Sequence, residues 1–156
     1  MEEYVFGANI LENLTTGMYQ DSRVIYREYI QNACDQIDKA YDMGLLRDEE
    51  GCIDIWFDAE NRTVSIVDNA TGIPSVDFER TLADIANSDK RLGEDKGFRG
   101  IGRLCGLAYC KELIFTSKAA GEDVISIMHC DAAKMRELIS ANERGEKHTA
   151  SEVLHS

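Results

Sequence analysis

The chain has 156 residues, 44% of them hydrophobic and only one a proline, which is enough for one folded domain and excludes a disordered chain. Its 17 basic and 29 acidic side chains give a net charge of -12, and no basic stripe is visible, so direct nucleic-acid binding by this segment is not expected. No apolar run reaches the length of a membrane span. The five cysteines have scattered spacings and no CxxC pair, which favours reduced thiols and a cytoplasmic protein.

The first part of the chain predicts two helices. Residues 4–18 have the apolar spacing of a helix or helical arm. A longer helix is expected over residues 23–43, because Asp21 or Ser22 can cap its start and Gly44 can end it. The apolar side chains of this second helix fall on one face, so it is amphipathic.

The middle of the chain predicts a β-hairpin and then a helix. Residues 52–57 alternate apolar and polar side chains, residues 63–67 are a β-branched run, and residues 58–62 are typical of a turn. Residues 75–86 have helical spacing and begin with a serine that can cap the helix. Residues 87–96 are polar and lack periodicity, which indicates a loop.

The last part predicts a short helix at residues 103–108, strands at 112–117 and 123–130, a helix at 131–141 and a final strand within 148–156. We find no internal repeat or linker, so we expect a single domain over the whole chain. This order of elements favours an α+β layered sandwich with a largely antiparallel sheet over a doubly wound parallel one.

Three polar side chains lie on one face of the expected second helix. Glu28, Asn32 and Asp35 are spaced four and then three residues apart, which stacks them along that face. Such a group could orient water, hold a hard cation or face solvent. A polar stripe opposite an apolar one is also what any amphipathic helix has, so the helix alone does not decide.

Two glycine-bearing segments follow. Gly97, Gly100 and Gly102 open a helix, where backbone N–H groups can face an anion, or they form a turn that packs against a neighbour. Asp68 ends a strand and Gly72 follows it. These two either form a strand-terminating turn or hold the Asp68 carboxylate as an acceptor for a ligand N–H, with Gly72 admitting the flat face of that ligand.

In this order, the three segments resemble the ATP-binding boxes of the superfamily that includes gyrase, the ninety-kilodalton heat-shock chaperones, histidine kinases and MutL, the GHKL or Bergerat-fold ATPases. The resemblance covers residues 6–117 and is closest to the N-terminal ATP-binding domain of the chaperones. Residues 82–88 are similar to the segment that enters the nucleotide lid there. The resemblance implies a two-layer α/β sandwich, with helices covering one face of a mostly antiparallel sheet.

The resemblance also implies a role for each polar position. Glu28 would be the catalytic general base that polarises the attacking water, Asn32 would give an oxygen to Mg²⁺, and Asp35 would reach the nucleotide through water. Asp68 would accept from the exocyclic amine of adenine, beside Gly72. The phosphates would be cradled by Gly97, Gly100, Ile101, Gly102 and Arg103. Ser88 and Lys90 would contact the ligand on lid closure, and Thr149 would assist adenine binding.

The sequence departs from the family pattern in two places. Alanine stands at position 70, where the family usually has glycine, and the lid between Ser88 and Gly97 is much shorter than in the chaperones. Members that hydrolyse ATP usually receive a catalytic lysine or arginine from a second domain. We therefore expect slow hydrolysis of ATP to ADP and phosphate by this segment alone, which would be the N-terminal part of a longer protein.

The leading hypothesis is a Mg²⁺-dependent, chaperone-like ATPase module, in which lid closure drives a conformational switch. Its partners would be ATP or ADP, other domains of the same chain and, in one arrangement, a second copy in a nucleotide-dependent homodimer. The alternative is an ATPase module of MORC, topoisomerase or mismatch-repair type, with DNA contacts made elsewhere. A histidine-kinase domain is disfavoured by Glu28, and a nucleotide-gated interaction module with vestigial hydrolysis is a further reading.

Overall fold

The computed structural model describes residues 21–83, 102–135, 137 and 154–155. Its helices are α2 (Val24–Asp42), α3 (Ser75–Ala83) and the 3-10 helix η3 (Gly102–Ala108). Its strands are β1 (Ile53–Asp58), β2 (Thr63–Asp68), β3 (Glu112–Ser117), β4 (Ser126–Asp131) and β5 (Leu154–His155). The helix expected over residues 4–18 and the loop expected over residues 87–96 lie outside these ranges.

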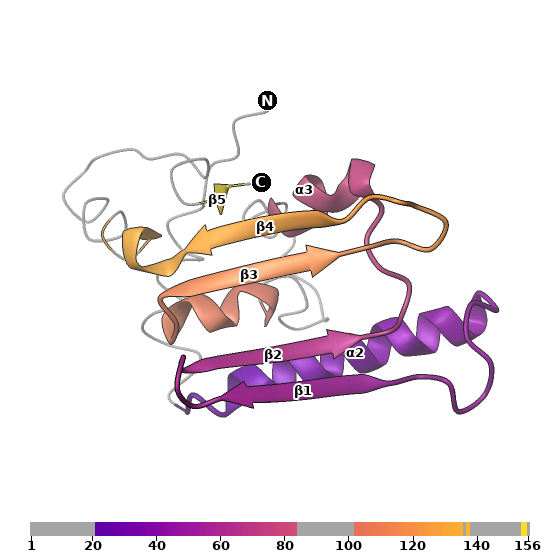
Figure 1. Ribbon diagram of the computed structural model, residues 1–156, viewed down its shortest axis with the longest axis horizontal. Helices are drawn as coiled ribbons and strands as arrows, with labels where there is room; N and C mark the ends of the chain where they lie inside the picture. Colours follow the sequence, from indigo (N-terminus) through magenta and orange to yellow (C-terminus); the bar gives the residue numbers. More distant parts are fainter. Residues whose placement is uncertain (1–20, 84–101, 136, 138–153, 156) are drawn as a thin grey trace, which may run out of the picture.

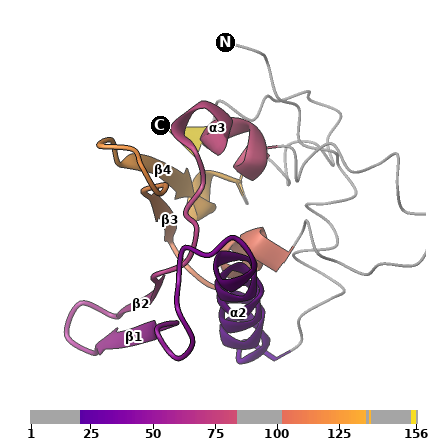
Figure 2. The same cartoon turned by 90° about the vertical axis from the view of Figure 1, so that its right-hand side faces the viewer.

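The strands form an antiparallel hairpin, β1–β2, and an antiparallel sheet in the order β3-β4-β5 (Figure 1). The segment after β2 joins the two: the Ile73 amide donates to Ser117 Oγ at 2.7 Å, and the Ala120 amide donates to the Thr71 carbonyl at 3.3 Å. In Figure 2, α2, η3 and α3 lie on the same side of strands β1 to β4. The predicted α/β sandwich, with antiparallel strands and helices on one face, is confirmed.

The C-terminal end of α2 follows the predicted signal, and its N-terminal end does not. Gly44 has a φ of +70° just past the helix, and the Leu45 amide donates to the Ala40 carbonyl at 2.9 Å. This is the left-handed glycine stop that the sequence predicts. The predicted cap by Asp21 or Ser22 is wrong: Arg23 occupies the cap position, and no side chain caps the helix there. Asp21 Oδ1 instead accepts from the Arg23 amide at 3.0 Å, within the turn that precedes the helix.

The β1–β2 hairpin forms as predicted, with each strand ending one residue later than expected. At its turn, the Asp58 carboxylate accepts from the Asn61 amide at 3.0 Å and from Asn61 Nδ2 at 2.7 Å. These bonds hold the turn and fix the register, in which Ile55 lies opposite Ile66. The same register places Asp68 at the last paired position of β2, opposite Ile53.

The main core lies between the inner face of β3–β4 and the helices α3 and η3. Its buried members are Phe78, Leu82, Leu104, Cys105, Leu107, Met128, Cys130, Ala132 and Met135. On α2, Ala33, Ile37 and Ala40 are buried. Residues 132–135 are helical, and Asp131 caps them as predicted, since its Oδ1 accepts from the Lys134 amide at 2.9 Å. No helix in the described part of the chain is long and apolar enough to cross a bilayer.

Two further boundaries differ from the sequence expectations. The strand expected from residue 123 starts at Ser126, because Glu122 turns back to bind the first amide of α3 and residues 123–125 connect it to the strand. The helix expected from Arg103 starts at Gly102 and is of the tighter 3-10 type. Gly106 allows η3 to pack closely against Tyr29 of α2.

Candidate functional site

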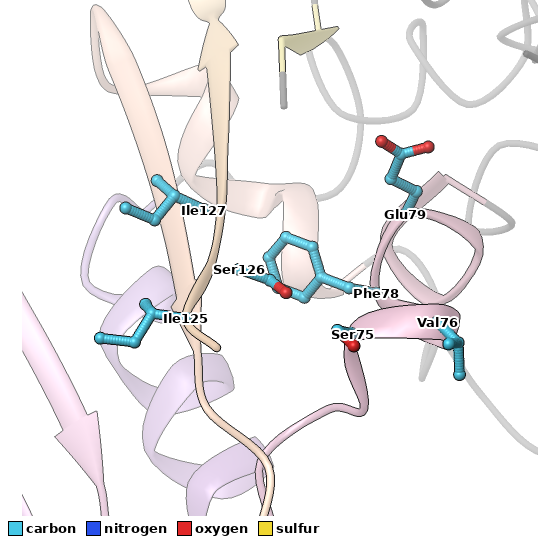
Figure 3. Close-up of a pocket in the computed structure, with 7 residues that line it drawn as sticks. All are labelled: Ser75, Val76, Phe78, Glu79, Ile125, Ser126 and Ile127. Atoms are coloured by element: carbon cyan, nitrogen blue, oxygen red, sulfur yellow. The ribbon is translucent and has the colours of Figure 1, made fainter. Parts of the chain in front are cut away.

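Two surface hollows lie away from the predicted site residues. One, of about 330 Å³, lies between the start of α3 and β4 and is lined by Ser75, Val76, Phe78, Glu79, Ile125, Ser126 and Ile127 (Figure 3). The other, of about 320 Å³, is at the tip of the β1–β2 hairpin. Neither is lined by Glu28, Asn32 or Asp68. The candidate site is therefore defined by α2 and the elements beside it.

The polar stripe of α2 is not a uniformly solvated face. The Glu28 side chain is only 21% exposed and forms an ion pair of 3.4 Å with Arg27. Asn32 is half-buried, whereas Asp35 one turn further is exposed. The stripe thus runs from a partly covered end at Glu28 and Asn32 to an open end at Asp35.

Asn32 has an unsatisfied polar atom. Its Nδ2 is buried, and no residue in the described ranges offers it a hydrogen bond. Such a group costs free energy unless something pairs with it. Because the O and N positions of an amide exchange by a half-turn of the side chain, this buried position can present either a donor or an acceptor. An amide so placed fits an oxygen-seeking cation or a polar ligand.

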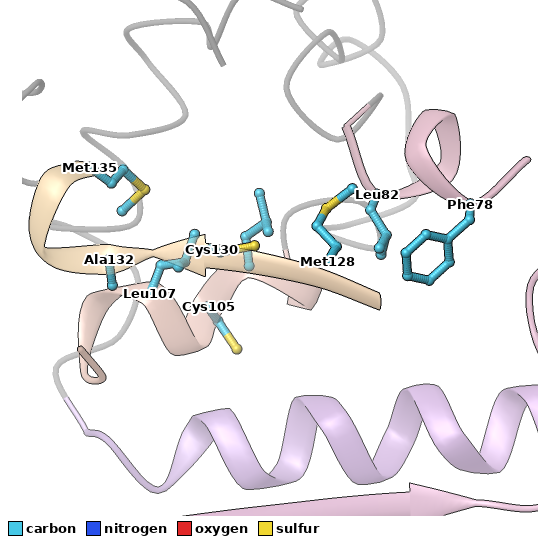
Figure 4. Close-up of a cluster of buried hydrophobic side chains, with 9 residues drawn as sticks. Phe78, Leu82, Cys105, Leu107, Met128, Cys130, Ala132 and Met135 are labelled. Carbon is cyan, nitrogen blue, oxygen red and sulfur yellow. The ribbon is translucent and has the colours of Figure 1, made fainter. Parts of the chain in front are cut away.

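The helix α2 packs against η3 near Glu28. The Gly106 amide donates to the Tyr29 hydroxyl at 3.1 Å. Burial, with a smaller effect from the Glu28 charge, raises the pKa of the Cys105 thiol to about 11. Figure 4 shows Cys105 pointing from η3 toward α2. The structure therefore brings Glu28 beside the helix that opens with Gly102, the last glycine of the predicted phosphate loop.

The end of β2 carries Asp68 on the surface. Its Oδ1 accepts from the Ala70 amide at 3.1 Å, so the carboxylate is oriented by the turn that follows it. Gly72 has a φ of +64°, and a Cβ there would overlap the backbone of Lys118 and Ala119. This close packing accounts for the glycine, and its contact with a ligand stays a prediction.

The structure describes only two of the remaining predicted site residues. Gly102 and Arg103 form the first turn of η3. Ser88, Lys90, Gly97, Gly100, Ile101 and Thr149 lie outside the described residues. Sequence reasoning missed the contact of Tyr29 with Gly106. A glycine within a helical segment was the only available signal, because such glycines often mark a close approach.

The family model for the "Histidine kinase-, DNA gyrase B-, and HSP90-like ATPase" matches residues 21–154, which include Glu28, Asn32, Asp68 and every described helix and strand except the last residue of β5. The chain belongs to this ATPase family. The resemblance inferred from the sequence is confirmed, and the chain carries a domain of the ATPase family.

Chaperone proteins named HtpG are similar to this GHKL module. HtpG of Helicobacter hepaticus is 30% identical over 132 residues, covering 73% of this chain and 21% of its own length. HtpG of Bacillus licheniformis is 31% identical over 130 residues, covering 73% and 21%. HtpG of Fusobacterium nucleatum is 33% identical over 104 residues, covering 61% and 17%. The chain spans about a fifth of the length of the curated relatives it matches.

Proposed function

We propose that this chain is the Mg²⁺-dependent ATP-hydrolysing module of a chaperone-like protein, in which lid closure over the nucleotide drives a conformational switch. Family membership and the similarity to chaperones named HtpG support this proposal. The observation that carries it is the half-buried pair Glu28 and Asn32 on the face of α2 beside η3.

Glu28 is the general base in this proposal. Its carboxylate is mostly covered but keeps access to solvent, so it can hold an attacking water and take its proton. Arg27 pairs with it at 3.4 Å and helps to orient it. A carboxylate in this position favours attack by water over transfer to a histidine.

Asn32 is the proposed protein ligand of Mg²⁺. Its buried amide has an atom without a partner in the described residues, and Mg²⁺ is commonly held by one or two side-chain oxygens, phosphates and water. When bound, the ion neutralises phosphate charge. Asn32 would hold the ion one helical turn from Glu28.

Asp68 is the proposed adenine acceptor. One of its oxygens is oriented by the Ala70 amide, which leaves the other for the exocyclic amine. Asp35, exposed at the open end of the stripe, would act through water. The phosphate contacts would come from Gly97, Gly100, Ile101, Gly102 and Arg103, the lid contacts from Ser88 and Lys90, and a second adenine contact from Thr149, with Gly72 beside the base.

Hydrolysis by the module alone is expected to be slow, because family members usually receive a catalytic cation from a second domain. The match to about a fifth of HtpG supports a place within a longer protein, and the module is proposed to be its N-terminal part. A nucleotide-dependent homodimer and a cytoplasmic location remain part of the proposal. The alternative is an ATPase module of MORC, topoisomerase or mismatch-repair type. The domains that accompany this module in the full protein would distinguish it from a chaperone-like module.

The direct test is a thermal-shift titration with ATP·Mg on wild type and on Asp68→Asn. Wild type should gain stability, by about 2.7 kcal/mol at 100 times the Kd. In Asp68→Asn, the oxygen bound to the Ala70 amide can be kept, but the other oxygen becomes a donor that faces the adenine amine, so the shift should be lost. Asp54→Asn, on exposed β1, is the matched control and should behave as wild type. Absence of any shift in wild type would sink the proposal.

A further inference from the structure

Tyr29 connects α2 to η3 through its hydroxyl group. The hydroxyl accepts from the Gly106 amide at 3.1 Å and is hydrogen-bonded to the Cys105 thiol. Burial raises the pKa of Tyr29 well above its usual range, so the phenol keeps its proton. The phenol can therefore donate one hydrogen bond while it accepts another.

Gly106 is shaped to fit this hydroxyl. A Cβ at position 106 would lie 2.7 Å from the Tyr29 oxygen, which is too close for any real contact. The next nearest atoms are Leu113 Cδ1 at 3.4 Å and Tyr29 Cε2 at 3.5 Å, both ordinary contact distances. The hydroxyl oxygen alone thus excludes a side chain at this position.

This link lies beside the proposed catalytic groups. Tyr29 directly follows Glu28, and the Glu28 charge acts on Cys105, the other η3 residue that the phenol contacts. Gly106 is one turn along the helix that begins with Gly102. The spacing of Glu28 from the start of η3 therefore depends on the contact between the Tyr29 hydroxyl and Gly106.

We propose that Tyr29 is a positioning residue for ATP hydrolysis, whose hydroxyl sets the spacing between α2, which carries Glu28 and Asn32, and η3, which continues from the phosphate loop. The proposal rests on the proposed ATPase function and adds to it. It assigns Tyr29 a role in the rate of hydrolysis that is separate from nucleotide affinity, because the residue acts through Glu28.

The test compares Tyr29→Phe, Gly106→Ala and the double variant with wild type. Three quantities are measured: the melting temperature, the Kd for ATP·Mg by thermal-shift titration, and the single-turnover rate for bound radiolabelled ATP. Tyr26→Phe is the matched control, because it also removes a tyrosine hydroxyl from α2. The Tyr26 ring packs against Phe57 of β1, with a ring-centroid distance of 6.3 Å.

In Tyr29→Phe, the turnover rate should fall about tenfold or more while the Kd changes less than about threefold, since small displacements of a catalytic group cost rate before affinity. Gly106→Ala should also be slow, because its methyl group meets the hydroxyl. The double variant should be no slower than Tyr29→Phe alone, because the methyl then meets only ordinary contacts. Tyr26→Phe should hydrolyse ATP as wild type does.

The outcomes separate the two proposals. A wild type that shows no ATP·Mg shift overturns the ATPase proposal together with this one. A wild type that binds and hydrolyses ATP, with Tyr29→Phe turning over bound ATP at the same rate, overturns the positioning role alone, whatever its melting temperature. Additive rate losses in the double variant also overturn it. If Gly106→Ala does not fold, recovery of folded protein on adding Tyr29→Phe supports the contact, and failure to recover contradicts it.

Discussion

Gly72 packs so closely against Lys118 that a Cβ at position 72 would overlap the Lys118 carbonyl oxygen. Gly72 follows β2, and Lys118 follows β3, so this contact joins the hairpin to the second sheet. Hydrogen bonds on both sides, from Ile73 to Ser117 and from Ala120 to Thr71, hold the two segments together. The contact fixes Asp68, at the end of β2, relative to the rest of the sheet.

Gly72→Ala should therefore lower stability strongly. The φ of +64° alone costs an alanine about 1–3 kcal/mol, and the overlap with the backbone of Lys118 adds to this. Gly121→Ala is the matched control: its φ is +81°, but a Cβ there meets nothing within 4 Å, so only the conformational cost applies. Urea denaturation measures both. Equal losses in the two variants would show that the packing contact is unimportant.

Glu28→Gln should separate nucleotide binding from hydrolysis. Glutamine keeps the size of the half-buried side chain but cannot take a proton, so hydrolysis should fall about 10²- to 10⁴-fold while ATP·Mg still stabilises the protein. Asp38→Asn removes an exposed carboxylate from the same helix and is the control. Turnover measured with radiolabelled ATP is the readout, and an active Glu28→Gln variant would remove Glu28 from the mechanism.

Glu122→Ala should destabilise α3. Both carboxylate oxygens of Glu122 accept from the Ser75 amide, at 3.2 and 3.0 Å, at the N-terminus of the helix. Loss of such a charged cap costs about 1 kcal/mol. The denaturation midpoint should fall accordingly, and Glu60→Ala at the exposed hairpin turn should leave it nearly unchanged. A midpoint for Glu122→Ala equal to wild type would argue against the cap.

The helices and strands were predicted well, because the residues that start and end each of them lie close together in the sequence. The positive φ of Gly44 and the Asp58–Asn61 turn are determined within a few positions of the chain, so the end of α2 and the hairpin followed from the sequence. The strand at residues 112–117 was also predicted with its observed bounds. Membership of the ATPase family came from three motifs taken in order, where each alone was ambiguous.

Contacts between distant segments could not be predicted in this way. Ser75 was predicted from its neighbours as the cap of α3, but nothing near it in the sequence predicts that its amide binds Glu122, 47 positions away. The contact of Tyr29 with Gly106 spans 77 positions and has no periodic signature. Gly72 was assigned to the ligand, whereas its packing against Lys118 is a structural reason for glycine that only the fold reveals.

Because two cysteine thiols are buried, the free energy of unfolding should fall in alkaline solution. Burial raises the pKa of Cys130 from 9.0 to about 12 and that of Cys105 from 9.0 to about 11. Below pH 9, both thiols are protonated in the folded and the unfolded chain and contribute nothing. Between pH 9 and the folded-state pKa values, the unfolded chain releases these protons first, so the free energy of unfolding falls as the pH rises.

The loss should be at most about 1.4 kcal/mol for each thiol and each pH unit. Urea midpoints between pH 7 and 10.5 measure it, with wild type compared to Cys130→Ala. The variant starts less stable, because a buried side chain is shortened, but its stability should fall less steeply above pH 9. Cys34→Ala, which removes an exposed thiol, should keep the wild-type slope. Parallel slopes for wild type and Cys130→Ala would mean that the Cys130 thiol does not govern the alkaline loss.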